Sequence, residues 1–235
     1  RMRGLRQRVV DLDRESNGAL VYSVRYGHLL QSDAFMGRYL ESREANVEVA
    51  ARKVLAHFEW RQEYAIDSIM QEDWSDLDRS GELKLAGLDR EGHSGWIWKL
   101  SLHDPNRTTA ERAARHIVTM MERALAHNTA EDQRIVGICD CTNVTPRNLD
   151  LAMLRIAIPV LQEQYPEVQI RTLLFPSGWL TASLWGVIQP LLAEKTRDKF
   201  QFMTQTEFKQ SLKQHYEPAQ IDEEYGGALV RGPGF

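Results

Sequence analysis

One short run of residues constrains the fold more than any other part of the chain. The sequence Ile135-Val136-Gly137-Ile138-Cys139-Asp140 is apolar at almost every position and has the length of a strand. A strand that faces water on one side alternates apolar and polar residues, so a continuous apolar run is typical of a strand covered on both faces. Such strands occur in parallel sheets flanked by helices, and this run therefore predicts an α/β fold.

Three further segments have the length and composition of strands, with helical patterns between them. These strand-like runs are residues 96–100, 170–175 and 199–203. Strands separated by long helical segments are typical of units in which neighbouring strands run parallel. We predict an α/β fold with a largely parallel sheet and flanking helices.

Two helix starts are marked between these strands. Thr108 and Glu111 form a capping box before an amphipathic helical pattern. Thr145 followed by Pro146 suits the N-cap and first turn of a second, densely apolar helix. Pro159 lies inside that second helix and is expected to kink or shorten it.

Residues 179–192 form the most apolar helical pattern in the chain, with apolar side chains on nearly every side. A helix of that kind is normally buried in a large core or in a membrane. This one is too short and too interrupted to span a bilayer. It lies between the strand-like run at 170–175 and a charged segment at 193–199. We predict that it forms a mobile wall over an apolar cavity.

The chain is expected to divide into a small helical part and a larger α/β part. Residues 1–27 are rich in arginine and receive no assigned structure, whereas residues 28–75 show a helical apolar pattern. Residues 76–230 hold the predicted sheet, and residues 231–235 form a tail. A chain of 235 residues is long enough for one large core and a small subdomain.

Charge and cysteine content limit the partners and the compartment. The formal net charge of −4 argues against general nucleic-acid binding, because a phosphate backbone requires a basic surface. We place Cys139 and Cys141 on opposite faces of one strand, where they do not suit a disulfide. Free cysteines predict a reducing, cytosolic setting. The sequence shows no leader peptide or lipidation motif, and its start at Arg1 points to a piece of a longer protein with additional domains.

The common catalytic motifs are absent from the sequence. It contains no phosphate-binding GxxxxGK[ST] loop, no strand-coupled GxGxxG and no esterase GxSxG. The seven histidines form neither an HExxH motif nor a cysteine–histidine ligand set. We predict a protein that is not an enzyme and that uses no metal or cofactor.

Several segments, in their order and spacing, resemble the CRAL-TRIO family of lipid-binding proteins. The resemblance covers residues 34–229 and is carried by residues 38–43, Trp60-Arg61, 88–92, Tyr165-Pro166-Glu167, 190–192, 196–199 and Glu224-Tyr225-Gly226-Gly227. In that family a helical N-terminal subdomain precedes an α/β lobe with a hydrophobic pocket, and the helix after the third strand acts as a gate. The resemblance therefore implies that residues 179–192 form the gate helix.

The resemblance also implies where a ligand headgroup would bind. In members that bind phosphatidylinositol, four positions contact the inositol phosphate, and they correspond here to Arg43, Glu167, Thr196 and Lys199. The two cations would supply charge-assisted donors to phosphate, the hydroxyl a further donor, and the carboxylate an acceptor for ring hydroxyls. Glu44, where the family often has lysine, disfavours a doubly phosphorylated ligand.

We expect the pocket and its gate to be formed by apolar side chains of the α/β part. They are Trp98, Met153, Ile156, Leu173, Trp179, Leu180, Leu184, Trp185, Ile188 and Leu191. Trp96 and Trp98 lie two apart in a strand, so they point the same way and either line the pocket or pack under a helix. Trp179 and Trp185 suit a bilayer interface.

The main functional hypothesis is a lipid-binding and lipid-transfer protein. It would hold one phospholipid, phosphatidylinositol, and exchange it during transient contact with the cytoplasmic surface of endoplasmic reticulum or Golgi membranes. One alternative is a carrier of a small hydrophobic ligand such as a sterol, tocopherol, retinoid or haem. Another is a membrane-tethering or interaction module whose core does not exchange.

Overall fold

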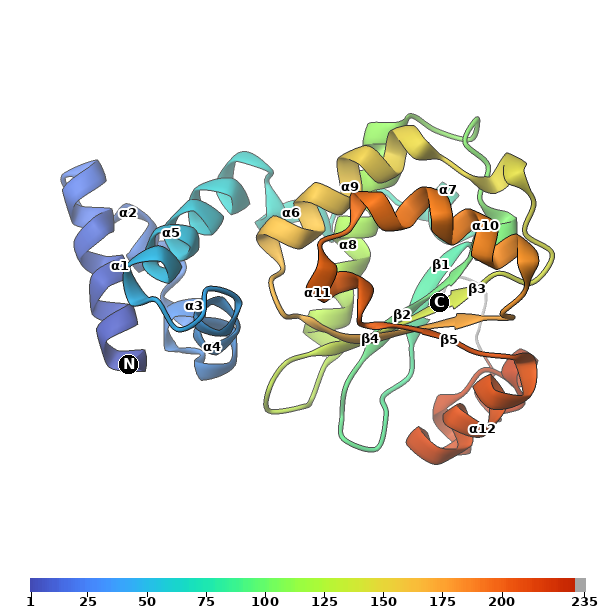
Figure 1. Ribbon diagram of the computed structural model, residues 1–235. Helices are drawn as coiled ribbons and strands as arrows, with labels where there is room; N and C mark the ends of the chain where they lie inside the picture. Colours follow the sequence, from blue (N-terminus) through green and yellow to red (C-terminus); the bar gives the residue numbers. More distant parts are fainter. Residues whose placement is uncertain (231–235) are drawn as a thin grey trace. The chain divides into compact units, whose positions relative to one another are not determined.

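The structure is a computed structural model that describes residues 1–230 of the chain, so the expected tail at 231–235 lies outside the described residues. The chain divides into two compact units. The first contains residues 1–72 together with the short segments 131–133 and 164–168, and the second contains the remainder (Figure 1). Each unit is built differently.

The first unit is entirely helical over its described elements. They are α1 (Met2–Asn17), α2 (Val21–Arg25), α3 (Gly27–Gln31), α4 (Asp33–Ser42), α5 (Val47–Glu63) and α6 (Ile66–Ile69). Helix α1 lies along α5 and buries Leu5, Val9 and Leu12 in the core of this unit. These residues recur at the spacing of one helix face, so the arginine-rich start of the chain is part of the folded unit.

An aromatic cluster surrounds a buried histidine in the first unit. The rings packed around His57 belong to Phe35, Tyr39, Phe58, Trp60 and Tyr165. His57 is 2% exposed, and its Nδ1 lies 3.1 Å from the side-chain oxygen of Gln164. Burial, and then the charge of Arg61, lower the pKa of His57 to about 3, so the imidazole is neutral in the folded protein.

The second unit is built on one five-stranded sheet whose spatial order follows the chain. The strands are β1 (Leu83–Ala86), β2 (Gly95–Lys99), β3 (Ile135–Asp140), β4 (Gln169–Phe175) and β5 (Phe200–Phe202). Only the β1–β2 pairing is antiparallel, and the other three pairings are parallel. Every residue of the central strand β3 is buried. The predicted α/β fold with a largely parallel sheet is confirmed.

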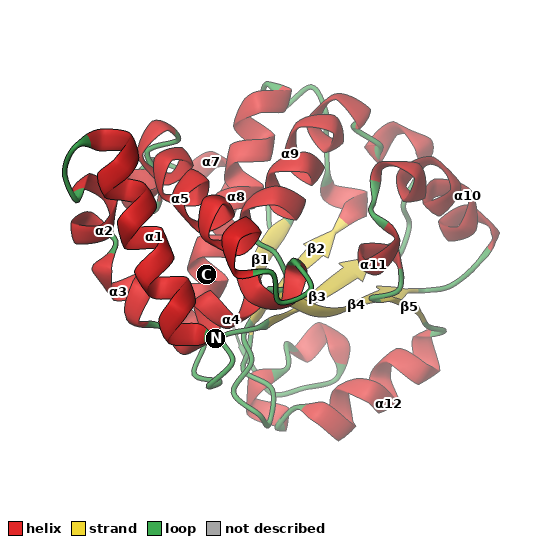
Figure 2. Ribbon diagram, turned by 60° about the vertical axis from the view of Figure 1, so that its left-hand side comes forward, coloured by secondary structure: helices red, strands yellow, loops and turns green. Residues whose placement is uncertain are grey.

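The strand order places the connecting helices on one face. Each parallel connection moves in the same direction across the sheet, and right-handed crossovers then put all of their helices on the same side. Figure 2 shows these helices on one face and the C-terminal helix on the other. The helices of the second unit are α7 (Ser75–Asp78), α8 (Ala110–His127), α9 (Leu151–Gln164), α10 (Trp179–Ile188), α11 (Glu194–Arg197) and the C-terminal helix α12 (Gln205–His215). Short 3-10 turns occupy η1 (Leu100–Leu102), η2 (Pro146–Asn148), η3 (Gln189–Leu191), η4 (Pro218–Gln220) and η5 (Glu223–Tyr225).

Some helix boundaries differ from the sequence prediction. Helix α8 is capped by Thr109, whose hydroxyl accepts a hydrogen bond from the Arg112 amide, and not by Thr108. Thr145 opens the η2 turn, and α9 starts later, where the Asp150 carboxylate accepts from the Met153 amide. Helix α9 continues through Pro159. The sequence marked each helix start only to within a few residues, and the loop geometry decides which polar side chain caps the helix.

Candidate functional site

The sheet face that α12 covers is closely packed. Ile97, Ile138, Leu173 and Phe175 point toward this face, and each is no more than 4% exposed. The ring of Phe175 stacks on that of Phe208 in α12. These four strand residues keep almost no accessible surface, so this face of the sheet is a filled core.

The opposite face, toward the connecting helices, carries two rows of side chains that follow from strand register. Trp98, Cys139, Leu174 and Phe202 form one row of paired positions, and Trp96, Gly137, Thr172 and Phe200 form the next. Paired residues of neighbouring strands point to the same side of a sheet. A side chain on Gly137 would collide with the ring of Trp96, whose carbon Cζ2 would lie 2.6 Å from the added Cβ. Gly137 therefore makes room for the indole.

This second face is less completely buried than the first. Trp96, Trp98 and Phe200 are only half-buried although they belong to apolar clusters between the sheet and the helices. The inward side of α10 shows the same partial burial. Its half-buried residues are Leu180, Leu184, Trp185 and Ile188. Apolar side chains in a filled core lose nearly all of their accessible surface, so these side chains between α10 and the sheet are less completely buried than those that face α12.

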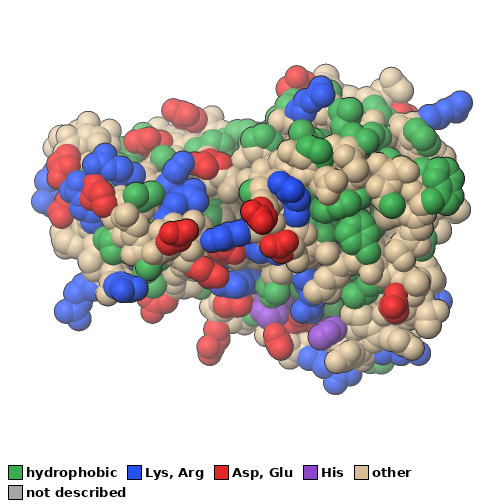
Figure 3. Space-filling model, viewed as in Figure 1, with side chains coloured by type: hydrophobic (Ala, Val, Ile, Leu, Met, Phe, Trp, Pro, Cys, Tyr) green, Lys and Arg blue, Asp and Glu red, His purple; other side chains and the backbone are tan. Residues whose placement is uncertain are grey.

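Helix α10 is apolar on its outward side as well. Trp179 is 81% exposed and Val187 is 41% exposed. On the inward side, the Trp185 ring lies 4.7 Å from the Phe200 ring and 5.2 Å from the Phe202 ring. Figure 3 shows hydrophobic side chains gathered on the part of the surface that carries this helix. A short helix that is apolar on both sides therefore covers the half-buried aromatic residues of the sheet.

These features can be compared with known proteins. A sequence profile of the CRAL/TRIO domain matches residues 78–227. The chain belongs to the CRAL-TRIO family. Patellin-6 of Arabidopsis thaliana is 22% identical over 210 residues, which are 84% of this chain and 51% of patellin-6. Human clavesin-2 is 29% identical over 212 residues, 86% of this chain and 64% of clavesin-2. The chain therefore spans about half to two thirds of the length of these relatives.

A solved structure supports the same fold. The crystal structure of Sfh5 superposes with a TM-score of 0.70 and covers 86% of this chain and 73% of that one, at 14% sequence identity. The CRAL-TRIO family is a family of lipid-binding and lipid-transfer domains, and residues 179–192 of the sequence prediction are α10 followed by η3. Over residues 1–230, no helix combines the length and hydropathy that a bilayer crossing requires.

The four positions that the CRAL-TRIO resemblance assigns to a headgroup are divided between the units. Arg43 ends α4 and donates to the Ser42 carbonyl, and Glu167 lies in the left-handed region at φ 55°, before β4; both are half-buried residues of the first unit. Thr196 lies in α11, and Lys199 lies directly before β5, in the second unit. The Lys199 amide donates to the Thr196 carbonyl at 3.2 Å. The structure thus brings the last two together in one turn.

Most of the predicted pocket and gate residues belong to the apolar clusters between the sheet and the connecting helices. Trp98, Met153, Ile156, Trp185, Ile188 and Leu191 belong to one apolar cluster, and Leu180 and Leu184 belong to the neighbouring one. The assignment of Leu173 to the pocket is wrong, because it points toward α12. Alternation along β4 puts its neighbour Leu174 on the gate side instead.

The expectation that the two cysteines face opposite ways is also wrong. Cys139 and Cys141 are both free and buried, and both belong to the apolar cluster beneath α10. Residues two apart in an extended segment share a face. Burial raises the pKa of the Cys141 thiol to about 12, so the two thiols act as apolar surface on the gate side.

Trp98 is fixed by a buried polar group that the sequence did not reveal. Its indole N–H donates to Glu82, whose carboxylate also lies 2.7 Å from Nδ1 of His103. The second nitrogen of His103 lies 3.4 Å from the Asp150 carboxylate. Burial lowers the pKa of His103, but hydrogen bonds and charges of Glu82 and Asp150 outweigh it and raise the pKa overall. This charged group orients an aromatic wall and forms no metal site: over residues 1–230 no three metal-ligand side chains are placed to hold an ion.

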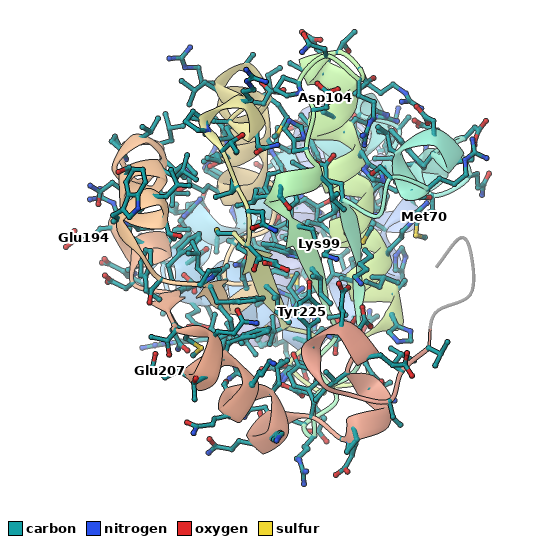
Figure 4. The ribbon with its side chains drawn as sticks, turned by 90° about the vertical axis from the view of Figure 1, so that its right-hand side faces the viewer. Met70, Lys99, Asp104, Glu194, Glu207 and Tyr225 are labelled. Carbon is teal, nitrogen blue, oxygen red and sulfur yellow. The ribbon has the colours of Figure 1, made fainter. Side chains whose placement is uncertain are left out.

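The segment Glu224-Tyr225-Gly226-Gly227, which carried part of the family resemblance, ties the end of the chain to the sheet. Lys84 and Lys99 both form ion pairs with Glu224, and the Tyr225 hydroxyl donates to Asp140 at 3.0 Å. Figure 4 labels Lys99 and Tyr225 in this part of the second unit. A side chain on Gly227 would collide with the Ile221 carbonyl oxygen. These residues have a structural role on the filled side of the fold.

Proposed function

We propose that this CRAL-TRIO domain binds one phospholipid, with phosphatidylinositol as its ligand, between α10 and the sheet, and exchanges it at membrane surfaces. The observation that carries the proposal is the difference between the two sheet faces. The strand residues that face α12 are closely packed, while Trp96, Trp98, Phe200 and the inward residues of α10 keep part of their apolar surface accessible. Binding, and not catalysis, is the activity that such a surface supports.

The energetics of lipid transfer require the protein to shield acyl chains from water. Each methylene exposed to water costs about 0.8 kcal/mol, so an acyl chain of about 16 carbons costs on the order of 13 kcal/mol in transit through water. Apolar residues on both sides of α10 suit a helix that contacts acyl chains when closed and a bilayer when displaced. The exposed indole of Trp179 adds a residue that is favoured at membrane interfaces.

The direct test is to identify what the purified chain carries. We expect native extraction and mass spectrometry to find one phospholipid per chain, enriched in phosphatidylinositol, and the protein to move phosphatidylinositol between vesicles. An empty protein that exchanges no phospholipid would contradict the proposal. A bound sterol, tocopherol, retinoid or haem would favour the small-ligand carrier, which the aromatic rows of the gate-side face also suit.

The headgroup assignment predicts a selective loss. Lys199→Ala and Glu167→Ala should each lower transfer of phosphatidylinositol by about tenfold, because a charge-assisted hydrogen bond is worth about 1.5–3 kcal/mol. Transfer of a lipid without an inositol ring should change much less. The measurement is transfer of fluorescent phosphatidylinositol and phosphatidylcholine in parallel, with Lys209→Ala, an exposed lysine of α12, as the control. Equal loss for both lipids would contradict the assignment.

The membrane contact predicts a second loss at the outward side of α10. Trp179→Ala should weaken sedimentation with liposomes by roughly threefold to tenfold, since the buried area of one indole at the interface is lost. Val24→Ala removes an apolar side chain of similar exposure, 74% against 81%, from α2 in the other unit and is the matched control. Identical liposome binding by Trp179→Ala and the unchanged protein would favour the interaction module with a non-exchanging core.

A further inference from the structure

One side chain of α9 contacts the end of the gate segment and the residues that follow it at three points. The amide nitrogen of Gln162 donates to the Leu191 carbonyl at 3.2 Å, and its oxygen accepts from the Ala193 amide at 2.6 Å. The Thr196 hydroxyl lies 3.5 Å from the same oxygen. A primary amide is one of the few side chains that can donate and accept at once, and Gln162 uses both capacities on one short stretch of backbone.

The residue between these two contacts is also held. Leu192 is 7% exposed and packs in the apolar cluster that includes Ala157 and Ile158 of α9. Its carbonyl accepts from the Arg197 guanidinium at 3.0 Å. Each of the three residues from Leu191 to Ala193 is therefore fixed by at least one specific contact of its backbone, and the middle one is anchored by its side chain.

Within helix α10, the polar side-chain attachments to neighbouring segments come from Thr181 in its first turn. The Thr181 hydroxyl donates to the Pro176 carbonyl just before the helix and shares a hydrogen bond with the Cys141 thiol, and the Ser183 hydroxyl donates within the helix. The remaining contacts of α10 with the sheet are apolar, through residues such as Leu184 and Trp185. Apolar contacts are non-directional and allow a helix to shift, whereas the hydrogen bonds beyond its C-terminal end fix a position.

We propose that Gln162 is a positioning residue that clamps the pivot of the gate and thereby sets the rate of ligand exchange. This inference rests on the proposed lipid-transfer function and adds the part of the chain about which α10 moves. The Thr196 hydroxyl then contributes to the clamp through its contact with the Gln162 side chain, a role that does not depend on a headgroup. The consequence is that loosening the clamp changes how fast any ligand leaves, without selecting between headgroups.

The substitution that tests the clamp is Gln162→Met, which keeps the length and helix preference of the side chain but removes both hydrogen bonds. Gln162→Ala is the second variant, and Gln210→Ala, an exposed glutamine of α12, is the matched control. The full chain is loaded with a fluorescent phosphatidylinositol, and its release to phosphatidylcholine vesicles is followed in time. We expect both Gln162 variants to release ligand roughly threefold to tenfold faster, consistent with the net contribution of one or two hydrogen bonds.

A second measurement needs no ligand. Hydrogen exchange of the Ala193 amide, which donates to Gln162, should be faster in both variants, while exchange in the central strand β3 stays unchanged. Unchanged Ala193 exchange would overturn the clamp even if no chain took up lipid. If Ala193 exchange rises but the unchanged protein carries no phospholipid, the proposed function fails and the attachment of the pivot stands.

Thr196→Val separates the clamp from headgroup binding at the same residue. The substitution removes only the longest of the three contacts, so a clamp residue should alter release by less than Gln162→Met and equally for all lipids. Release of phosphatidylinositol that accelerates alone, with other lipids unaffected, would overturn the assignment of Thr196 to the clamp.

Discussion

Leu184→Trp should reduce phospholipid loading by at least about tenfold, because it enlarges a side chain in the layer that the ligand would occupy. Leu184 is half-buried on the inward side of α10 and packs in the cluster with Cys139 and Leu174. An indole at this position would take space from an acyl chain between helix and sheet. Because Leu184 is only half-buried, we expect the folded protein to accept the larger side chain with little change in thermal stability. Lipid per chain, measured by mass spectrometry after vesicle incubation, reports the effect.

Val187→Trp is the matched substitution on the other side of the same helix. Val187 is 41% exposed, so the same indole would enlarge the outward surface and leave the layer beneath α10 unchanged. Loading should then equal that of the unchanged protein, and liposome binding should be as strong or stronger. Equal loading by the Leu184 and Val187 variants would show that the ligand lies elsewhere.

The stability of the first unit should depend on the neutral state of His57. Its pKa in the folded protein is about 3, below the ordinary value of 6.5. As pH falls below 6.5, His57 of the unfolded chain binds a proton that the folded chain does not bind. Stability is therefore lost progressively until the pH approaches 3. This interval corresponds to a loss of up to about 5 kcal/mol in the free energy of unfolding.

The measurement is urea unfolding between pH 7.5 and pH 4, compared with His57→Gln. Glutamine is neutral at every pH and can bond to Gln164, so this variant should lose less stability on acidification, although it is less stable at neutral pH because it lacks the ring contacts. Carboxylates common to both proteins cancel in the difference. Parallel stability curves over this range would mean that His57 is accessible to protons in the folded state.

The sequence predicted the sheet of the second unit because its strands are marked by burial on both sides. The apolar run at 135–140 has no polar position that could face water, and it is the central strand β3. Residues 179–192 were equally informative, since an all-round apolar helix leaves few alternatives in a protein without a membrane-spanning pattern. The resemblance to the CRAL-TRIO family then implied that this helix is the gate.

Other features depend on contacts that a single sequence does not show. The burial of Leu5, Val9 and Leu12 in α1 was hidden by the arginines between them, although their spacing of four and three residues is a helix signal. The side of β4 that faces the gate depends on its exact alternation, and an offset of one residue exchanged Leu173 for Leu174. The contacts of Gln162 could not be recognised, because its partners lie 29 to 34 positions later in the chain and meet it only in the folded structure.

The order of the strands has a consequence for how this domain can diversify. A sheet wound in one direction places its closely packed core and the surface that we propose binds lipid on opposite sides of the same strands. Alternate residues of one strand then contribute to different properties: Ile97, Ile138 and Leu173 to stability, and Trp98, Cys139 and Leu174 to the proposed lipid-binding surface. Substitutions can therefore change what the protein carries while leaving nearly constant its capacity to fold, and a single scaffold can acquire new cargo without new architecture.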